Sequence, residues 1–261
     1  MSVIKVQGDS IHYITGDSFD ESLPTVLLVH GAGQNSSTWD YQLDLLRNFP
    51  KANFIVIDLP GHGKSEGEGR RTVKDYSDFL KQFTDASGLR NIIITGHSMG
   101  GGVVMHYALE HPEDIAACIL VGTGANISVA GQSLEAVKNN YELFCEVAPS
   151  RAFAQSSPER LRDSFKKCLL DIDRGVCYWD LVAFDRFDIR DRVSGIKAPT
   201  MIITGSEDLL TLPKHGLHLH EQIKDSVYHE IEDAGHFMMQ EKPQLFNRLF
   251  LEFLDARIER S

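Results

Sequence analysis

The chain has 261 residues, a length that suits one α/β domain with an insertion. Its 37 acidic and 26 basic residues give a net charge of −11 without a basic block that could follow a phosphate backbone, so we expect no nucleic-acid partner. No stretch approaches the roughly 18 apolar residues of a membrane span, and the N-terminus lacks a signal-peptide pattern, so we expect a cytoplasmic protein with no membrane partner.

Cysteine spacing points to the same compartment. The four cysteines show neither a CxxC pair nor a histidine at zinc-ligand spacing, which is typical of reduced thiols in a cytoplasmic protein. We therefore expect no metal site from Cys118, Cys145, Cys168 and Cys177.

Short apolar runs mark the predicted strands in chain order. The first two, at 3–6 and 11–14, alternate in polarity and are typical of an antiparallel edge pair. Those that follow are continuous, which suits strands covered on both faces, and helix-like segments separate them. This order predicts an α/β fold with a mainly parallel sheet. The continuous runs lie at 26–29, 54–57, 92–95, 117–121 and 200–204, a last strand is expected near 227–231, and the clearest helices at 73–86 and 102–112.

Between residues 124 and 190 the sequence contains no apolar run typical of a buried strand. This stretch contains SPERLRDSFKKCLL, in which Ser157 is predicted to cap a helix and Pro158 to occupy its first position. We therefore predict a helical cap at 124–190, inserted into a core formed by 1–123 and 191–261. One face of the predicted helix would hold Leu161, Phe165, Cys168 and Leu169.

The sequence GHSMG at 96–100 stands between a buried strand and a helix. A strand that turns directly into a helix forces its corner residue into strained backbone angles and leaves room only for small neighbours, a demand that Gly96 and Gly100 meet. The turn would expose the Ser98 hydroxyl at the helix N-terminus, and the backbone N–H of Met99 would face the same space. The pattern predicts Ser98 as a nucleophile and Met99 as an oxyanion donor.

A serine nucleophile requires a base and a group that orients the base. Asp208 follows the run TMIIT, and His236 lies in DAGHFMMQEKP after the last predicted strand. Serine, acid and histidine in this chain order are typical of this sheet topology, so we predict His236 as the base and Asp208 as its partner. Glu207 and Asp233 compete for the acidic role and are interpreted as exposed turn residues.

The loop after the run at 26–29 reads HGAGQNSSTW and should supply the second oxyanion donor. Gly31 and Gly33 allow a close backbone approach, so we predict the N–H of Ala32 as the donor, with that of Gly33 as the reserve. His30 is expected to order this loop and Trp39 to pack it down.

Taken together, these motifs resemble the α/β-hydrolase superfamily, in its branch of small cap-bearing esterases and enol-lactonases. The resemblance implies an eight-stranded, mostly parallel sheet flanked by helices, with an inserted cap, a serine triad and no cofactor. The matching motifs are HGAG at 30–33, DLPGHGKS at 58–65, GHSMGG at 96–101, APTMIITGSED at 198–208 and AGHFMMQEKP at 234–243.

Two other patterns resemble ligand-binding motifs, but the residues around them favour an ordinary turn and an exposed helix face. The GKS of GHGKSEG lacks the glycine that a phosphate-binding loop needs five positions before Gly63, where Asp58 stands. In HGLHLH, His220 would point away from His215 and His218 on a helix, which favours a solvated face over a metal site.

The substrate pocket should lie where residues 124–190 cover Ser98. We expect its walls to include Gly33, Trp179, Phe184 and Phe237. Cap arginines could bind a substrate carboxylate, although a solvated surface explains most of them. The candidates are Arg151, Arg160, Arg162 and Arg174.

Serine at the turn narrows the chemistry. Family members that displace halide or open epoxides need a carboxylate there, so acyl transfer to water is favoured, and we expect a small carboxylic ester or lactone as substrate. Carbon–carbon bond hydrolysis of a diketone is the alternative reaction. A receptor-like member that changes shape around a ligand is a further alternative, and the sequence leaves a homodimer open.

Overall fold

A computed structural model describes residues 2–129 and 131–259, and within these residues eight strands form one sheet. The strand order is β1-β2-β4-β3-β5-β6-β7-β8. β1 and β2 pair antiparallel, as predicted, β2 is antiparallel to β4, and the remaining pairs are parallel. The strands are β1 Ser2–Val6, β2 Asp9–Thr15, β3 Thr25–Val29, β4 Asn53–Ile57, β5 Ile92–His97, β6 Ile115–Val121, β7 Thr200–Gly205 and β8 Ser226–Ile231.

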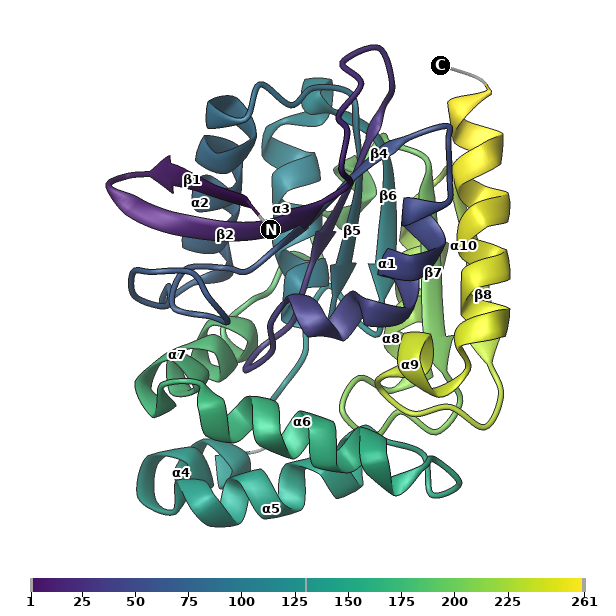
Figure 1. Cartoon of the computed structure of the whole chain (residues 1–261). Helices are drawn as coiled ribbons and strands as arrows, with labels where there is room; N and C mark the ends of the chain where they lie inside the picture. The colour runs from purple at the N-terminus through teal and green to yellow at the C-terminus, as the bar shows by residue number, and fades with distance from the viewer. Residues whose placement is uncertain (1, 130, 260–261) are drawn as a thin grey trace.

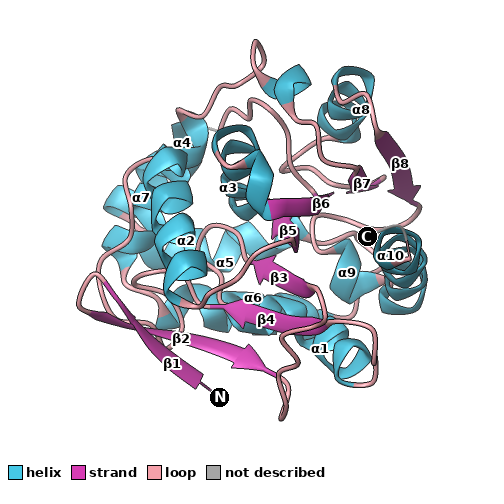
Figure 2. Ribbon diagram, turned by 90° about the horizontal axis from the view of Figure 1, so that it is seen from above, coloured by secondary structure: helices cyan, strands magenta, loops and turns pink. Residues whose placement is uncertain are grey.

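Helices cover both faces of the sheet (Figure 2). Leu27 and Val29 of β3 belong to the buried cluster that includes side chains of α2 and α3, whereas Val26 and Leu28 belong to the cluster with α1 and α10. Since successive strand residues point to opposite faces, a continuous apolar run is what this double coverage requires. The helices of the core are α1 Asp40–Arg47, α2 Val73–Ala86, α3 Met99–Glu110, α8 Pro213–Gln222, α9 Met238–Glu241 and α10 Pro243–Ile258. These findings confirm the predicted α/β fold.

The chain between β6 and β7 forms helices that gather at one end of the sheet (Figure 1). Their location agrees with the predicted helical insertion, although its status as a separate cap domain with boundaries at 124 and 190 stays a prediction. We refer to this group as the cap helices. They are α4 Gly131–Asn139, α5 Tyr141–Ala152, α6 Glu159–Asp171 and α7 Arg174–Asp185.

The start of α6 differs from the prediction. The helix begins at Glu159, with Pro158 in the capping position and no side-chain cap. The Ser157 hydroxyl instead donates a hydrogen bond to the Glu241 carboxylate of α9, so the predicted Ser157 cap was wrong. The predicted apolar face is present, because Leu161 and Leu169 are buried.

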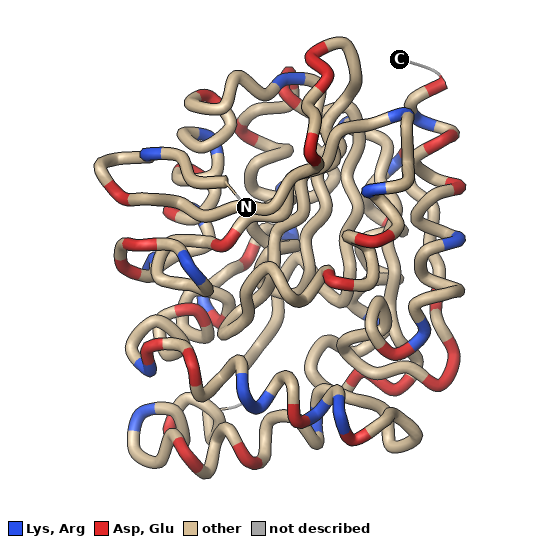
Figure 3. Tube along the Cα trace, viewed as in Figure 1, with Lys and Arg blue, Asp and Glu red and all other residues tan. Residues whose placement is uncertain are grey.

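Acidic and basic residues are interspersed along the chain, including along the cap helices (Figure 3). Among the described residues, no helix has both the length and the apolar character needed to cross a bilayer.

Candidate active site

Ser98 occupies a strained turn between β5 and α3. Its backbone angles, φ 54° and ψ −121°, lie where L-residues are rare, and its side chain is 8% exposed. A Cβ atom on Gly96 would lie 2.3 Å from the carbonyl oxygen of Gly100, and one on Gly100 would lie 2.4 Å from that of His30. The predicted need for glycine on both sides of Ser98 therefore has a direct steric cause.

The structure brings Asp208 and His236 together from the segments that follow β7 and β8. Asp208 Oδ2 lies 2.7 Å from His236 Nδ1, and both side chains are buried. The other carboxylate oxygen, Oδ1, accepts hydrogen bonds from the backbone N–H groups of Leu210 and Thr211, each at 2.8 Å. Because the carboxylate is held from both sides, it can fix the orientation of the imidazole ring and leave Nε2 available.

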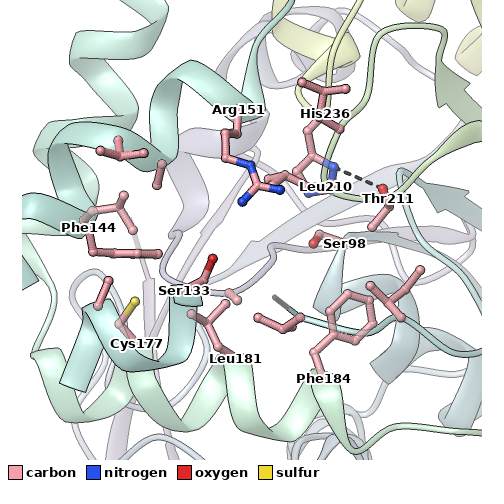
Figure 4. A pocket seen from close by; sticks show the side chains of 18 of the residues that line it. Ser98, Ser133, Phe144, Arg151, Cys177, Leu181, Phe184, Leu210, Thr211 and His236 are labelled. Atoms are coloured by element: carbon pink, nitrogen blue, oxygen red, sulfur yellow. Dashed lines mark hydrogen bonds between the residues drawn. The ribbon is translucent and has the colours of Figure 1, made fainter. Parts of the chain in front are cut away.

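Ser98 and His236 line the same cavity of about 370 Å³, which lies between the core and the cap helices (Figure 4). Ala32 and Phe184, both predicted at the site, also line it. Most of the wall is apolar, which suits a small ligand with a hydrophobic portion. The apolar lining includes Ile127, Leu143, Phe144, Val147, Leu181 and Leu210.

The structure bears on the two predicted oxyanion donors, the backbone N–H groups of Ala32 and Met99, and on the reserve donor Gly33. Met99 is the first residue of α3, so its N–H has no acceptor within the helix. Ala32 lines the cavity. Gly33 cannot serve as the reserve donor, because its N–H already donates to Asp180 Oδ2 at 2.9 Å. The catalytic roles of Ser98, Asp208, His236, Ala32 and Met99 stay predictions at this point.

Three of the expected pocket residues lie outside the cavity lining. Trp179 packs its ring under the Arg71 guanidinium, 4.3 Å from the ring centroid, because Cys177, Leu181 and Phe184 occupy the cavity-facing side of α7. Phe237 is 2% exposed and stacks on Phe153 at 4.8 Å, since the chain turns after His236 and directs the next side chain into the core. Gly33 is in contact with cap side chains rather than with the cavity.

The other side chains singled out in the sequence lie around the site or on the surface of the protein. His30 is buried and its Nε2 accepts the Leu59 N–H at 3.0 Å, so it does order the loop, and Trp39 is buried as predicted. Glu207 and Asp233 are exposed. Of the cap arginines, Arg151 lines the cavity, whereas the others bind elsewhere on the protein. These are Arg160 to the Tyr41 hydroxyl, Arg162 to the Ala154 and Ser157 carbonyls, and Arg174 to the Lys138 carbonyl.

Sequence reasoning missed supporting residues around the acid–histidine pair. The Thr211 hydroxyl donates to Asp208 Oδ2 at 2.7 Å and lies 3.2 Å from His236 Nδ1. His97 lies beneath His236, with ring centroids 4.5 Å apart, and its ring nitrogens contact Gln34 Oε1 at 3.0 Å and the His236 carbonyl at 2.9 Å. Burial lowers the pKa of His97 well below its usual range. The residue before Ser98 and the threonine three positions after Asp208 were the available clues.

Comparisons with known proteins show what this chain is similar to. A family model described as the alpha/beta hydrolase family matches residues 26–249. A 2-hydroxy-6-oxo-6-phenylhexa-2,4-dienoate hydrolase of Comamonas testosteroni is 29% identical, over 89% of this chain and 88% of that protein. The enol-lactonase structure from Burkholderia xenovorans LB400 has a TM-score of 0.90 at 24% identity, covering 97% of this chain and 100% of that one. A thermophilic esterase structure has a TM-score of 0.85 at 30% identity, covering 98% and 97%.

Proposed function

Because this chain belongs to the alpha/beta hydrolase family, we propose that it is a serine hydrolase that cleaves a small carboxylic ester or lactone through an acyl-enzyme. The observation that carries the proposal is the 2.7 Å pair of His236 Nδ1 and Asp208 Oδ2 on a cavity that the Ser98 side chain shares. The esterase and enol-lactonase similarities support the choice of substrate class.

The proposed reaction assigns each proton to a named atom. As Ser98 Oγ bonds to the substrate carbonyl carbon, its proton passes to His236 Nε2, and Asp208 stabilises the resulting imidazolium. The carbonyl oxygen becomes an oxyanion that accepts hydrogen bonds from the N–H groups of Ala32 and Met99. The tetrahedral intermediate then collapses: the bond between the carbonyl carbon and the leaving oxygen breaks, and the leaving oxygen takes the proton from His236. Water then attacks the acyl carbon while His236 Nε2 takes its proton. The bond between the acyl carbon and Ser98 Oγ breaks, Ser98 Oγ takes the proton from His236, and the carboxylic acid leaves.

A panel of chromogenic esters from acetyl to octanoyl, with an aryl ester and a simple lactone, tests this proposal at neutral pH. We expect multiple turnover by the wild type and none above background by Ser98→Ala. A fluorophosphonate probe should add its mass to the wild type but not to Ser98→Ala. Equal rates in the two proteins, or tight retention of product after one turnover, would reject the hydrolase proposal in favour of a ligand-binding role.

Carbon–carbon bond hydrolysis is the second candidate, and Arg151 is the observation that favours it. Its side chain extends from the last turn of α5 into the cavity (Figure 4). Across residues 2–129 and 131–259, no acidic side chain pairs with this guanidinium, so it is available for a substrate carboxylate. The name of the Comamonas testosteroni relative specifies a dienoate, a substrate that carries such a group.

The second candidate is tested with 2-hydroxy-6-oxo-6-phenylhexa-2,4-dienoate itself. If carbon–carbon hydrolysis is the task, kcat/KM for this acid should exceed that for every neutral ester, and Arg151→Met should lower it about tenfold or more. Arg186→Met removes an exposed charge elsewhere on the cap and is the matched control. Rapid turnover of esters without cleavage of the dienoate would reject carbon–carbon hydrolysis and retain the ester or lactone hydrolase proposal.

A further inference from the structure

Asp180 of α7 is fully buried and joins the cap helices to the core. Its Oδ2 accepts hydrogen bonds from the Gly33 N–H at 2.9 Å and from His62 Nε2 at 2.7 Å, and its Oδ1 accepts the Tyr76 hydroxyl at 2.5 Å. These donors belong to three separate parts of the core, namely the loop after β3, the turn after β4, and α2. One cap carboxylate therefore fixes three core segments relative to α7.

The buried contact between Asp180 and His62 is an ion pair when His62 is protonated. His62 Nδ1 lies 3.0 Å from the Pro60 carbonyl, and Nε2 lies 2.7 Å from the Asp180 carboxylate. Both partners are acceptors, an arrangement that favours the doubly protonated ring of His62. Burial by itself would lower the pKa of His62, but the adjacent Asp180 raises it above the usual range.

Other titratable groups around His62 are compatible with this charge. The His30 ring lies 4.8 Å away, and its Nε2 accepts the Leu59 N–H. Burial, reinforced by the charge of His62, lowers the pKa of His30 to about 4, so His30 is neutral near pH 7. The Asp58 carboxylate also favours the charged form of His62. The Tyr76 hydroxyl, next to His62, donates its hydrogen bond to Asp180.

The loop that Asp180 holds is the one that carries Ala32. Gly33 follows Ala32 directly, has φ +65°, and is in close contact with the cap, because a Cβ atom there would lie 2.8 Å from Leu169 and 3.3 Å from Cys177. Cys177, which neighbours Gly33, also lines the substrate cavity, as does Leu181 of the same helix. The same helix therefore borders both the cavity and the Ala32 loop.

We infer that Asp180 is a positioning residue that orients the Ala32 N–H toward the substrate carbonyl, so that the placement of α7 over the substrate sets the strength of the oxyanion site. This inference rests on the proposed hydrolase function. An oxyanion donor acts mainly on the transition state, so its displacement should lower kcat more than it changes KM.

Asp180→Asn tests the inference with little change in volume. We expect kcat for a short ester to fall about tenfold to a hundredfold, with KM changed less than about threefold. Asp185→Asn, on the same helix, is the matched control, because its carboxylate binds the Val129 N–H instead of the Ala32 loop. We expect its kcat to stay within about twofold of the wild type. Equal losses in both variants would overturn the inference, since they would indicate general loosening of the cap.

The pH profile separates positioning from a merely structural role. In the wild type, kcat should fall at alkaline pH as His62 loses its proton and the ion pair with Asp180 is lost. Tyr76→Phe keeps the ion pair and should retain this limb, whereas Asp180→Asn should lack it. If Asp180→Asn does not fold, Asp180→Glu displaces Gly33 while keeping the charge, and a wild-type kcat in this variant would overturn the inference.

Hydrogen exchange of the loop amides gives a readout that does not depend on turnover. Asp180→Asn should accelerate exchange at Gly33 and in the peptide around it, and Asp185→Asn should not. If the wild type shows no Ser98-dependent hydrolysis, the proposed function fails. The role of Asp180 in holding the loop is rejected by a different result, namely an exchange rate at Gly33 that is the same in Asp180→Asn as in the wild type.

Discussion

At the scale of single residues, the site combines a strained backbone at Ser98 with a carboxylate at Asp208 whose two oxygens both accept hydrogen bonds. Ser98 is held at positive φ while the Asp208 carboxylate accepts hydrogen bonds from Leu210, Thr211 and His236. Buried polar groups cost little only when they are paired, so each of these partners restricts the others. The strain at Ser98 is sustained by its surroundings, which is typical of a site where geometry matters more than local stability.

Removing the Ser98 hydroxyl should separate activity from stability. In Ser98→Ala we expect ester hydrolysis to fall by about a thousandfold or more, because no other described group can attack from that position. The hydroxyl forms no hydrogen bond that is needed for folding, so the thermal midpoint should stay within a few degrees. Turnover and a melting curve on the same sample check both parts, and a retained rate would remove Ser98 from the mechanism.

Gly96→Ala should have the opposite effect. Its Cβ atom would overlap the Gly100 carbonyl at 2.3 Å, and both atoms belong to backbone that cannot move without opening the turn. We expect the free energy of unfolding to fall by about 3 kcal/mol, measured by urea denaturation. Gly131→Ala is the control, because nothing lies within 4 Å of a Cβ atom there. Similar midpoints for the two variants would contradict the steric explanation.

At the scale of elements, the loop that carries His236 is fastened to the cap as well as to the core. The His236 N–H donates to the Ala152 carbonyl at the end of α5, at 2.7 Å. Glu241 of α9 accepts the N–H groups of Gly235 and Phe237 through Oε1, at 3.0 and 3.1 Å, and that of Ala154 through Oε2, at 2.9 Å. The residues on both sides of His236 are therefore tied by the carboxylate that also holds the chain after α5.

Glu241→Ala should impair both stability and rate. Backbone N–H groups at Gly235, Phe237 and Ala154 would lose their acceptor, which should cost about 3 kcal/mol in the free energy of unfolding. Since His236 would lose its restraint, kcat should fall about tenfold even in the folded population. Glu221→Ala removes an exposed carboxylate from α8 and controls for charge. A destabilised variant with a wild-type kcat would show that the restraint on His236 comes from elsewhere.

The sequence predicted the strands and helices more accurately than it predicted the contacts between them. Continuous apolar runs identified the parallel strands because a strand buried on both faces needs apolar residues at successive positions, and this is visible in the sequence. GHSMG identified the turn because its steric demands involve only neighbouring residues. Trp179 was misplaced because residue spacing gives the relative directions of side chains on α7 but not which side meets the cavity. The bond between Gly33 and Asp180 spans 147 positions, and a single buried aspartate in a helix carries no pattern that names its partner.

At the scale of the whole molecule, buried histidines give the fold a dependence on pH. Burial lowers the pKa of His97 and of His30, the latter to about 4, whereas His62 beside Asp180 has a raised pKa. His30 and His97 favour folding above the usual histidine pKa of about 6.5, because in the range below it the unfolded chain binds protons that the folded chain does not. His62 contributes stability below that value and loses it as the pH rises through its folded pKa.

Acid should therefore destabilise the protein well before its carboxylates titrate. For His30 alone, the shift from 6.5 to about 4 corresponds to about 3 kcal/mol of stability that is lost progressively between those pH values. Urea unfolding at several pH values from about 7 to 4.5 should show the free energy of unfolding falling over this range. His30→Gln removes one of these protons, so its slope should be shallower by up to about 1.4 kcal/mol per pH unit. Parallel slopes for the wild type and His30→Gln would mean that His30 is already charged in the folded protein.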